Sequence, residues 1–145
     1  MAQRSTSEII EDFLSEGPWA VVGASTSREK YGNKVLRAYI QSGRASFPIN
    51  PRAEKVEGFT SYPDLAALPE VPRGISIVTP PEITEGVVEE AARLGVKFVW
   101  MQPGAESPRA LEIAAENGIE AMGDGWCLLV VVGFTEGGPT RWSGG

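Results

Sequence analysis

The chain has 145 residues, of which 42% are hydrophobic and 22% charged, and its formal net charge is −6. This size and composition predict one soluble globular domain, residues 1–145, that folds without staples. The acidic net charge argues against nucleic acid or an anionic membrane as a partner. Because no apolar run approaches the ~20 residues that span a bilayer, and no hydrophobic leader is present, we expect a cytoplasmic protein.

The first expected element is an N-terminal helix within residues 1–17. Ser5 to Glu8 form a capping-box pattern, apolar residues follow at helical spacing, and Gly17-Pro18 ends the pattern. Residues 19–22 are apolar at every position, as in a central strand of a parallel sheet. A second helix is expected from about Asn33, with Gly43 at its C-terminal end.

The middle of the chain predicts two more strands. Residues 45–50 form the second strand, although Pro48 cannot donate a hydrogen bond to a neighbouring strand. A loop with a short extended piece at 59–60 and a helical turn at 64–68 follow. Residues 74–79 form the third strand, and a helix with proline in its first turn runs from Pro81 to Gly95.

The last third continues the alternation. Residues 96–101 predict a fourth strand, Ser107-Pro108 opens a helix that Asn117-Gly118 closes, and residues 119–122 predict a short fifth strand. Residues 127–132 are apolar and predict either a strand or a buried closing segment. Residues 134–145 are expected to be a loose tail, in which only Trp142 is a candidate to dock on the domain.

Strands and helices that alternate at this spacing predict an α/β fold. The expected architecture is a Rossmann-like, three-layer fold with a mostly parallel sheet of about five strands. In such a sheet ligands bind outside the carboxyl ends of the strands, near the point where the strand order reverses. The loops after the strands are therefore the candidate site.

The absence of histidine excludes whole classes of chemistry. Ser-His-Asp and Cys-His catalysis, histidine-ligated zinc and the commonest general base at neutral pH all require it. The single cysteine, Cys127, excludes an internal disulfide and a thiolate metal cluster. Its apolar neighbours indicate a buried hydrophobic residue rather than a nucleophile.

The loop after the first strand, GASTSREKYGN from Gly23 to Asn33, matches no standard phosphate-binding signature. Arg28 and Glu29 stand where a Walker A loop needs Gly and Lys, and Ser25 and Arg28 stand where a dinucleotide fingerprint needs glycines. A nucleophile elbow would need a glycine at Ser27 and also a histidine. What remains is a hydroxyl-rich turn that leads to a helix N-terminus, which suits an anion such as a pyrophosphate.

The loop after the second strand carries a cation where NAD-binding domains usually place an acid. Its residues are Asn50, Pro51 and Arg52, which suit a phosphorylated ribose, either the 2′-phosphate of NADP or the 3′-phosphate of coenzyme A. Residues 28–55 contain seven basic and two acidic residues, a net charge of +5, so the remainder carries −11. This concentration of positive charge favours a small polyanion, with a solvated helix face as the alternative.

The runs VVGAS, PINPR, YPDL, IVTPP and FVWMQPGAES together resemble the small stand-alone CoA-binding proteins. These are similar to the CoA-binding domain of the succinyl-CoA synthetase alpha subunit, and the resemblance covers residues 19–132. It implies a domain that binds coenzyme A or an acyl-CoA without catalysis of its own. The synthetase reaction is not implied, because it needs a phosphorylated histidine from a separate domain.

This resemblance implies that each strand-end loop binds a different part of the ligand. The residues implied for the pyrophosphate are Gly23, Ala24, Ser25, Thr26, Ser27 and Arg28; those for the adenosine 3′-phosphate region are Asn50, Pro51 and Arg52; those for the adenine side are Thr79 and Pro80; and those for the pantetheine path are Met101, Gln102 and Pro103. Lys30 or Lys55 could add charge at a phosphate, and Cys127 could form a mixed disulfide with the CoA thiol. No metal ligand is expected, and a partner enzyme is unknown.

Two alternatives stay open. An NADP-dependent reductase also fits Arg52, with Tyr31 or Lys34 as the only proton donors that could be proposed. A regulatory or interaction subunit that kept the fold and lost the ligand is the other.

Overall fold

The computed structural model describes residues 4–136, so Trp142 and most of the expected tail lie outside the described part. The helices are α1 (Thr6–Ser15), α2 (Tyr31–Gln41), α3 (Pro81–Leu94), α4 (Pro108–Glu116) and α5 (Leu128–Val131), with a 3₁₀ turn η1 (Leu65–Ala67). The strands are β1 (Trp19–Val22), β2 (Ser46–Ile49), β3 (Lys55–Val56), β4 (Phe59–Thr60), β5 (Gly74–Ile77), β6 (Phe98–Met101) and β7 (Glu120–Met122).

The central sheet has five parallel strands in the order β2-β1-β5-β6-β7, which confirms the predicted α/β class and strand number. β1 lies between β2 and β5, with Val22 opposite Ile49 on one side and Ile77 on the other. The chain leaves β1 toward one edge and later returns to its other side, so the strand order reverses between β1 and β5. Pro48 is tolerated because β2 is an edge strand of this sheet.

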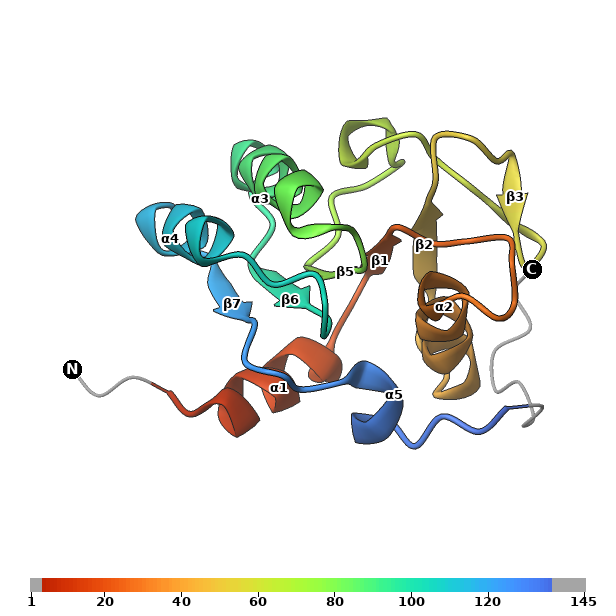
Figure 1. The fold of residues 1–145 in the computed structure, drawn as a ribbon, viewed down its shortest axis with the longest axis horizontal. Coiled ribbons are helices and arrows are strands. Elements are labelled where there is room, and N and C mark those ends of the chain that lie inside the picture. The colour runs from red at the N-terminus through yellow and green to blue at the C-terminus, as the bar shows by residue number, and fades with distance from the viewer. Residues whose placement is uncertain (1–3, 137–145) are drawn as a thin grey trace.

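Alternate residues of the strands supply two separate cores, one on each face of the sheet. Ala20, Val22 and Ile75 pack with α3 and α4, whereas Trp19 and Val21 pack with α1, α2 and α5. Figure 1 shows the same division, with α3 and α4 above the sheet and α1, α2 and α5 below it. The predicted three-layer arrangement is therefore confirmed.

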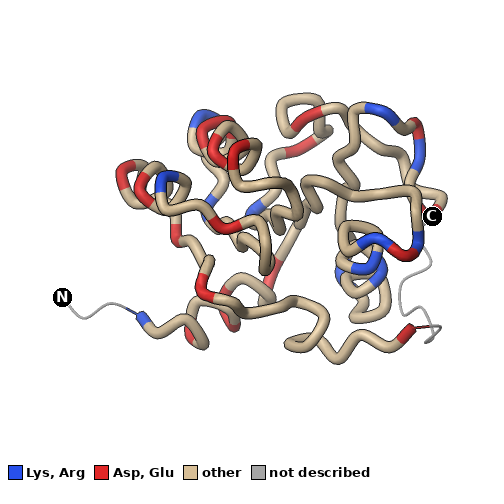
Figure 2. The backbone as a smooth tube through the Cα atoms, viewed as in Figure 1, with Lys and Arg blue, Asp and Glu red and all other residues tan. Residues whose placement is uncertain are grey.

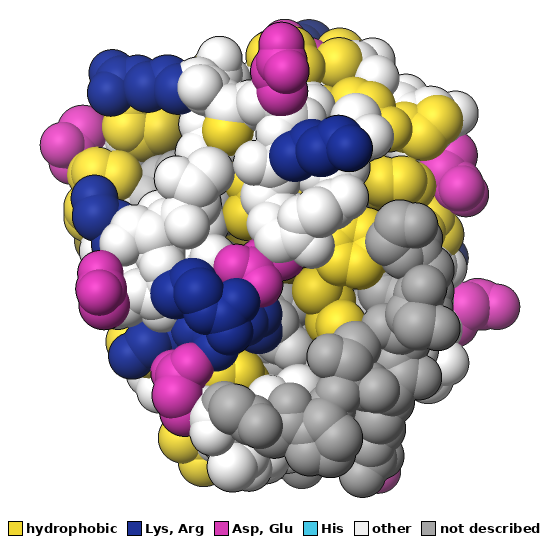
Figure 3. All heavy atoms as spheres, turned by 90° about the vertical axis from the view of Figure 1, so that its right-hand side faces the viewer, with side chains coloured by type: hydrophobic (Ala, Val, Ile, Leu, Met, Phe, Trp, Pro, Cys, Tyr) yellow, Lys and Arg dark blue, Asp and Glu magenta, His cyan; other side chains and the backbone are white. Residues whose placement is uncertain are grey.

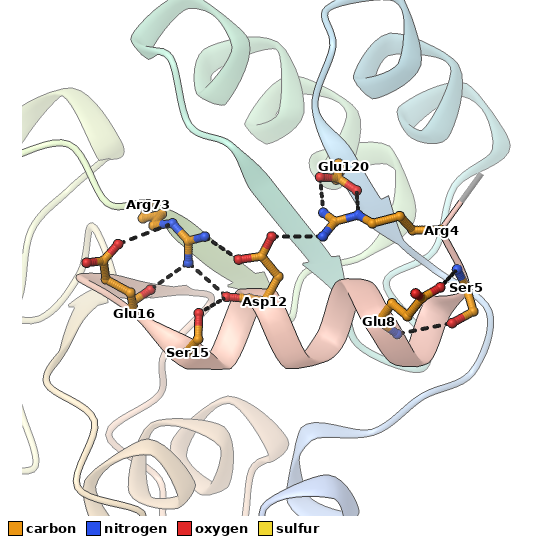
Figure 4. A network of polar contacts seen from close by, with 8 residues as sticks. All are labelled: Arg4, Ser5, Glu8, Asp12, Ser15, Glu16, Arg73 and Glu120. Carbon is orange, nitrogen blue, oxygen red and sulfur yellow. Dashed lines mark hydrogen bonds and ion pairs between the residues drawn. The ribbon is translucent and has the colours of Figure 1, made fainter. Parts of the chain in front are cut away.

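Helix α1 begins at the predicted capping box, in which Ser5 and Glu8 exchange side-chain and backbone hydrogen bonds. Phe13 packs its ring edge-on against Trp100, with ring centroids 5.4 Å apart. On the outer side, Asp12 joins Arg4 and Arg73, and Arg4 also pairs with Glu120 of β7 (Figure 4). These contacts fix α1 across the ends of β5 and β7 that lie opposite the candidate site.

Three local expectations needed correction. Of the two alternatives for residues 127–132, the strand is wrong: residues 128–131 form the short helix α5, which packs against α2. Lys55 and Val56 pair with Phe59 and Thr60, so the expected loop is a two-stranded hairpin. Helix α2 starts at Tyr31, two residues earlier than predicted, because Lys30 is its N-cap and the loop before it is shorter.

Candidate functional site

A cavity of about 1130 Å³ lies at the carboxyl ends of β1, β2 and β5, where the strand order reverses. Ligand pockets of proteins are typically ~300–1000 Å³, so this one can accept a ligand of nucleotide size. Of the predicted site residues, eight line it: Gly23, Ala24, Ser25, Asn50, Pro51, Arg52, Thr79 and Pro80. The structure thus brings three of the four strand-end loops together around one space.

In the loop after β1, two carbonyl groups accept hydrogen bonds from asparagine side chains, and the neighbouring backbone N–H groups are left without an acceptor among residues 4–136. Asn50 Nδ2 donates to the carbonyl of Ala24 at 2.9 Å, and Asn33 Nδ2 donates to the carbonyl of Ser25 at 2.8 Å. In a trans peptide the carbonyl and the next N–H point in opposite directions, so the N–H groups of Ser25 and Thr26 point away from these asparagines. Within residues 4–136, the N–H groups of Ala24, Ser25 and Thr26 have no protein acceptor.

The N-terminus of α2 adds to the same wall. Lys30 is the N-cap but provides no side-chain cap, and Tyr31 and Gly32 both line the cavity. A Cβ at position 32 would overlap the carbonyl oxygen of Gly23, so only glycine lets the helix approach the end of β1 this closely. Free N–H groups and the helix dipole make such a site favourable for an anion. Gly32 was missed in the sequence because its spacing from Gly23 fits no fingerprint.

Asn50 holds the loops after β1 and β2 together. Besides its bond to Ala24, its Oδ1 accepts from the backbone N–H of Arg52 at 2.8 Å. The nitrogen and the oxygen of the Asn50 carboxamide are therefore both hydrogen-bonded to backbone groups, and the role of Asn50 is to hold these two loops in position. Arg52 is exposed at the rim of the cavity, and among residues 4–136 its guanidinium has no ion-pair partner, whereas Arg28 and Arg37 are paired with Glu57 and Glu136.

The opposite wall comes from η1 and α3 and was not predicted. It combines apolar side chains with carboxylates: Asp64, Leu65, Glu82, Ile83, Val87 and Glu90. The sequence does contain a signal for the part of this wall that α3 forms, because Pro80-Pro81 places the first turns of a helix at the carboxyl end of the third strand. The cavity therefore has a cationic, donor-rich side and an apolar, acidic side.

A smaller cavity of about 220 Å³ adjoins the main one and shares Thr79 and Pro80 with it. Pro103, Gly104 and Ala105 form its other wall. Met101 and Gln102 are fully buried and line neither cavity, so their predicted contact with a pantetheine arm stays a prediction.

Tyr31 links the main cavity to Cys127. Its hydroxyl lies 2.7 Å from Cys127 Sγ and donates to Gln102 Oε1 at 3.2 Å. Cys127 is partly exposed rather than buried. Burial and the hydrogen bond with Cys127 raise the pKa of Tyr31 above its usual value, so this hydroxyl stays protonated at neutral pH.

Positive charge gathers on the side of the molecule that carries α2 and the β3–β4 hairpin (Figure 2). In the space-filling view of that side, basic side chains lie together with acidic ones among them (Figure 3). Of the seven basic residues in the 28–55 window, Lys30 and Arg52 line the cavity. Thr26, Ser27 and Arg28 belong to the same loop but are not among the lining residues, so their contact with a ligand also stays a prediction.

The described residues lack two features that would point to other functions. Residues 4–136 contain no group of three or more Cys, Asp or Glu side chains arranged to hold a metal ion. Nor does that part of the chain form a helix with the length and apolar character needed to cross a membrane.

Comparison with known proteins was made for sequence and for structure. Residues 18–133 match the family model of the CoA binding domain. The chain is 31% identical over 126 residues to an ADP-forming acetate–CoA ligase of Archaeoglobus fulgidus, which covers 79% of this chain and 19% of the ligase. It is 27% identical to the uncharacterized protein YneT of Bacillus subtilis, over 94% of this chain and the full length of YneT.

Solved structures show the same fold. A conserved hypothetical protein from Pyrococcus furiosus superimposes with a TM-score of 0.74 at 34% identity, over 78% of this chain and 97% of that one. A hypothetical protein from Pyrococcus horikoshii gives a TM-score of 0.81 at 27% identity, over 88% and 89%. The chain spans about a fifth of the Archaeoglobus ligase but most of these small proteins. With its fold, its cavity and the family match over residues 18–133, this chain belongs to the family of CoA-binding domains.

Proposed function

We propose that this domain binds coenzyme A or an acyl-CoA without catalysis of its own. The observation that carries the proposal is the row of free N–H groups at Ala24, Ser25 and Thr26 beside the N-terminus of α2, in a loop whose first residues, Gly23 to Ser25, line the cavity at the strand-order reversal. This arrangement supports a pyrophosphate at the donor-rich wall. Arg52 at the rim supports a contact with the 3′-phosphate, since a guanidinium can bind phosphate through two parallel hydrogen bonds.

The remaining parts of the ligand follow from the other walls. Leu65, Ile83 and Val87 offer an apolar surface for the adenine ring. Thr79 and Pro80, which the resemblance assigns to the adenine side, also border the smaller cavity, which would take the start of the pantetheine arm. The Archaeoglobus relatives are ligases, but this chain covers about a fifth of their length and has no histidine.

The reductase alternative has less support in the site. Tyr31 would have to donate a proton near the nicotinamide, yet the environment raises its pKa and thus weakens it as an acid. An NADPH oxidation assay with the purified protein tests this alternative directly.

The deciding experiment is calorimetric titration with CoA, dephospho-CoA, NAD and NADP. We expect CoA to bind most tightly and dephospho-CoA to bind about tenfold more weakly, because it lacks the phosphate that Arg52 would contact. The Arg52→Gln variant should bind both at the weaker level, and Lys55→Gln, which removes an exposed charge outside the cavity, should resemble the wild type.

Two results would contradict the assignment. Equal binding of CoA and dephospho-CoA by the wild type would remove the role of Arg52. Binding of neither compound would remove the proposed function.

A further inference from the structure

Glu57 has a backbone conformation that glutamate rarely adopts. Its φ is +52°, and within residues 4–136 no other residue besides glycine has a positive φ. Together with Gly58, at φ +83°, it forms the two-residue turn between β3 and β4. A turn with positive φ at both central positions favours Asn, Asp or Gly at the first of them. A strained residue of this kind persists only where its surroundings hold it in place, so the contacts of its side chain are informative.

The Glu57 carboxylate reaches the loop after β1 and the first turn of α2. One oxygen lies 2.5 Å from Arg28 Nη1, and the other accepts from Asn33 Nδ2 at 3.0 Å. Only 18% of the Glu57 side chain is exposed, against 59% of that of Arg28. Asn33 is fully buried. The hairpin thus inserts one negative charge between Arg28 of the loop after β1 and Asn33 of α2, both next to the residues that line the cavity.

Through Asn33 this charge orients the loop that carries the free N–H groups. Asn33 Nδ2 also donates to the Ser25 carbonyl at 2.8 Å, and Asn33 Oδ1 accepts from Arg37 Nε at 2.6 Å. Arg37 Nη2 in turn donates to the Arg28 carbonyl at 2.8 Å. Two carbonyls of the loop are therefore held toward α2, which leaves the Thr26 N–H pointing the opposite way.

We propose that Glu57 is a positioning residue for the anion-binding loop: its carboxylate fixes Arg28 and Asn33, and Asn33 fixes the peptide that presents the Thr26 N–H. This inference rests on the proposed function, since the anion is taken to be the pyrophosphate of CoA. It assigns a role to a residue whose own charge repels that ligand.

Because Glu57 repels the ligand, electrostatics and positioning predict opposite changes in CoA affinity when its charge is removed. By through-space electrostatics alone, removal of a negative charge beside the site and release of Arg28 should strengthen binding of a polyanion. If Glu57 positions the loop, its removal should instead weaken binding, because the ligand must then order the loop itself.

The test compares three variants by calorimetry with CoA. Glu57→Asn keeps a residue that suits the turn but shortens the side chain, and we expect about tenfold weaker binding, equivalent to ~1.4 kcal/mol. Glu57→Gln keeps the length without the charge and should weaken binding to a smaller extent. Glu54→Gln is the matched control, because it removes the same charge from an exposed neighbouring position, and its affinity should be unchanged or slightly higher.

Two further readouts separate positioning from general damage to the fold. The affinity of Glu57→Asn should fall by the same factor for CoA and for dephospho-CoA, because both contain the pyrophosphate. The melting temperature of this variant should not fall. In the ligand-free protein, amide hydrogen exchange of Ser27 and Lys30, whose N–H groups donate to Ser25 Oγ and to the Ser27 carbonyl, should be faster in Glu57→Asn than in Glu54→Gln.

The outcomes are distinct from those that test the proposed function. Wild-type or tighter binding of CoA by both Glu57 variants would overturn the positioning role while leaving CoA binding intact. If the wild type bound no CoA, the proposed function would fail, and hydrogen exchange would still decide the inference. Unchanged exchange of Ser27 and Lys30 would overturn it, and faster exchange confined to Glu57→Asn would support it.

Discussion

At the scale of single residues, a Cβ at position 32 would overlap the carbonyl oxygen of Gly23, and a Cβ at Gly23 would overlap the carbonyl oxygen of Val78. These two glycines allow β1, β5 and α2 to converge at the cavity. In a dinucleotide fingerprint the glycine for close packing of helix and strand comes five residues after the first. Here the loop is longer, and Gly32 takes that position inside the helix.

The first prediction at this scale concerns Gly32. Because backbone rather than a flexible side chain opposes the added methyl group, Gly32→Ala should destabilise the protein by about 1–3 kcal/mol and weaken CoA binding. Gly86→Ala is the matched control, since Gly86 lies inside α3 and an added Cβ meets nothing within 4 Å. It should raise stability by roughly 0.5–1 kcal/mol. Denaturant unfolding measures both, and equal effects of the two substitutions would contradict the close-packing role.

At the scale of elements, α1 is joined to the sheet by an apolar and a charged contact. Gly74 has no side chain where the Phe13 ring packs, and the outer face pairs Asp12 with Arg73 and Arg4. These two guanidinium groups, Arg73 first, hold the pKa of the Asp12 carboxyl below its usual range. The stability that the Asp12 contacts of α1 contribute therefore depends on pH, although α1 lies away from the cavity.

The prediction for α1 follows from the sign of this pKa shift. A folded-state pKa below the unfolded value, ~3.9 for aspartate, gives stability that is fully present above ~pH 5 and is lost as the pH falls. The wild type should therefore melt at a higher temperature than Asp12→Asn near neutral pH, and the difference should shrink as the pH falls below ~4. Glu11→Gln, at an exposed position of the same helix, is the control. A difference that stays constant from pH 7 to pH 3 would argue against the Asp12 contacts.

At the scale of the whole molecule, the cavity joins the two cores. Its walls combine the ends of β1, β2 and β5 with α2 from one face of the sheet and α3 from the other. A ligand in this position contacts both layers of helices. Its binding energy should therefore act on the unfolding of the entire domain rather than on one part of it.

The whole-molecule prediction is a single, ligand-dependent transition. At a CoA concentration 100 times Kd, linkage predicts about 2.7 kcal/mol of added stability. For a domain of this size that corresponds to a rise in melting temperature of roughly 5–10 °C. Differential scanning calorimetry should show one transition that moves upward as a unit, and adenosine should have little effect. Two separate transitions, with only one shifted by CoA, would contradict a ligand site shared by both cores.

Sequence patterns alone predict the class of fold and the loops where a ligand could bind. Alternating apolar strands and amphipathic helices allow only a parallel sheet covered on both faces, and the carboxyl ends of such strands lie on one edge. Gly23, Asn50, Arg52 and Thr79 could be singled out on this basis, and the structure places all of them around one cavity. The absence of histidine likewise limited the chemistry before any geometry was known.

Some local structure depended on contacts that no short stretch of sequence reveals. The run Val130-Val131-Val132 has high strand propensity, but residues 128–131 form a helix that packs against α2. The hairpin of β3 and β4 was missed because Glu57-Gly58 is an unfavourable version of the turn, stabilised by Arg28 and Asn33 from elsewhere in the chain.

Which residues of each loop line the cavity depends on contacts between distant parts of the chain, and these are visible only in the folded structure. It turned the Asn50 carboxamide and the carbonyls of Ala24 and Ser25 toward other protein groups, and it left backbone donors free. It also supplied the wall of Leu65, Ile83 and Val87. The physical reason is that hydrogen bonds between distant loops, together with the close approach of Gly32 to Gly23, fix the direction of each peptide, whereas residue spacing fixes only its place along the chain.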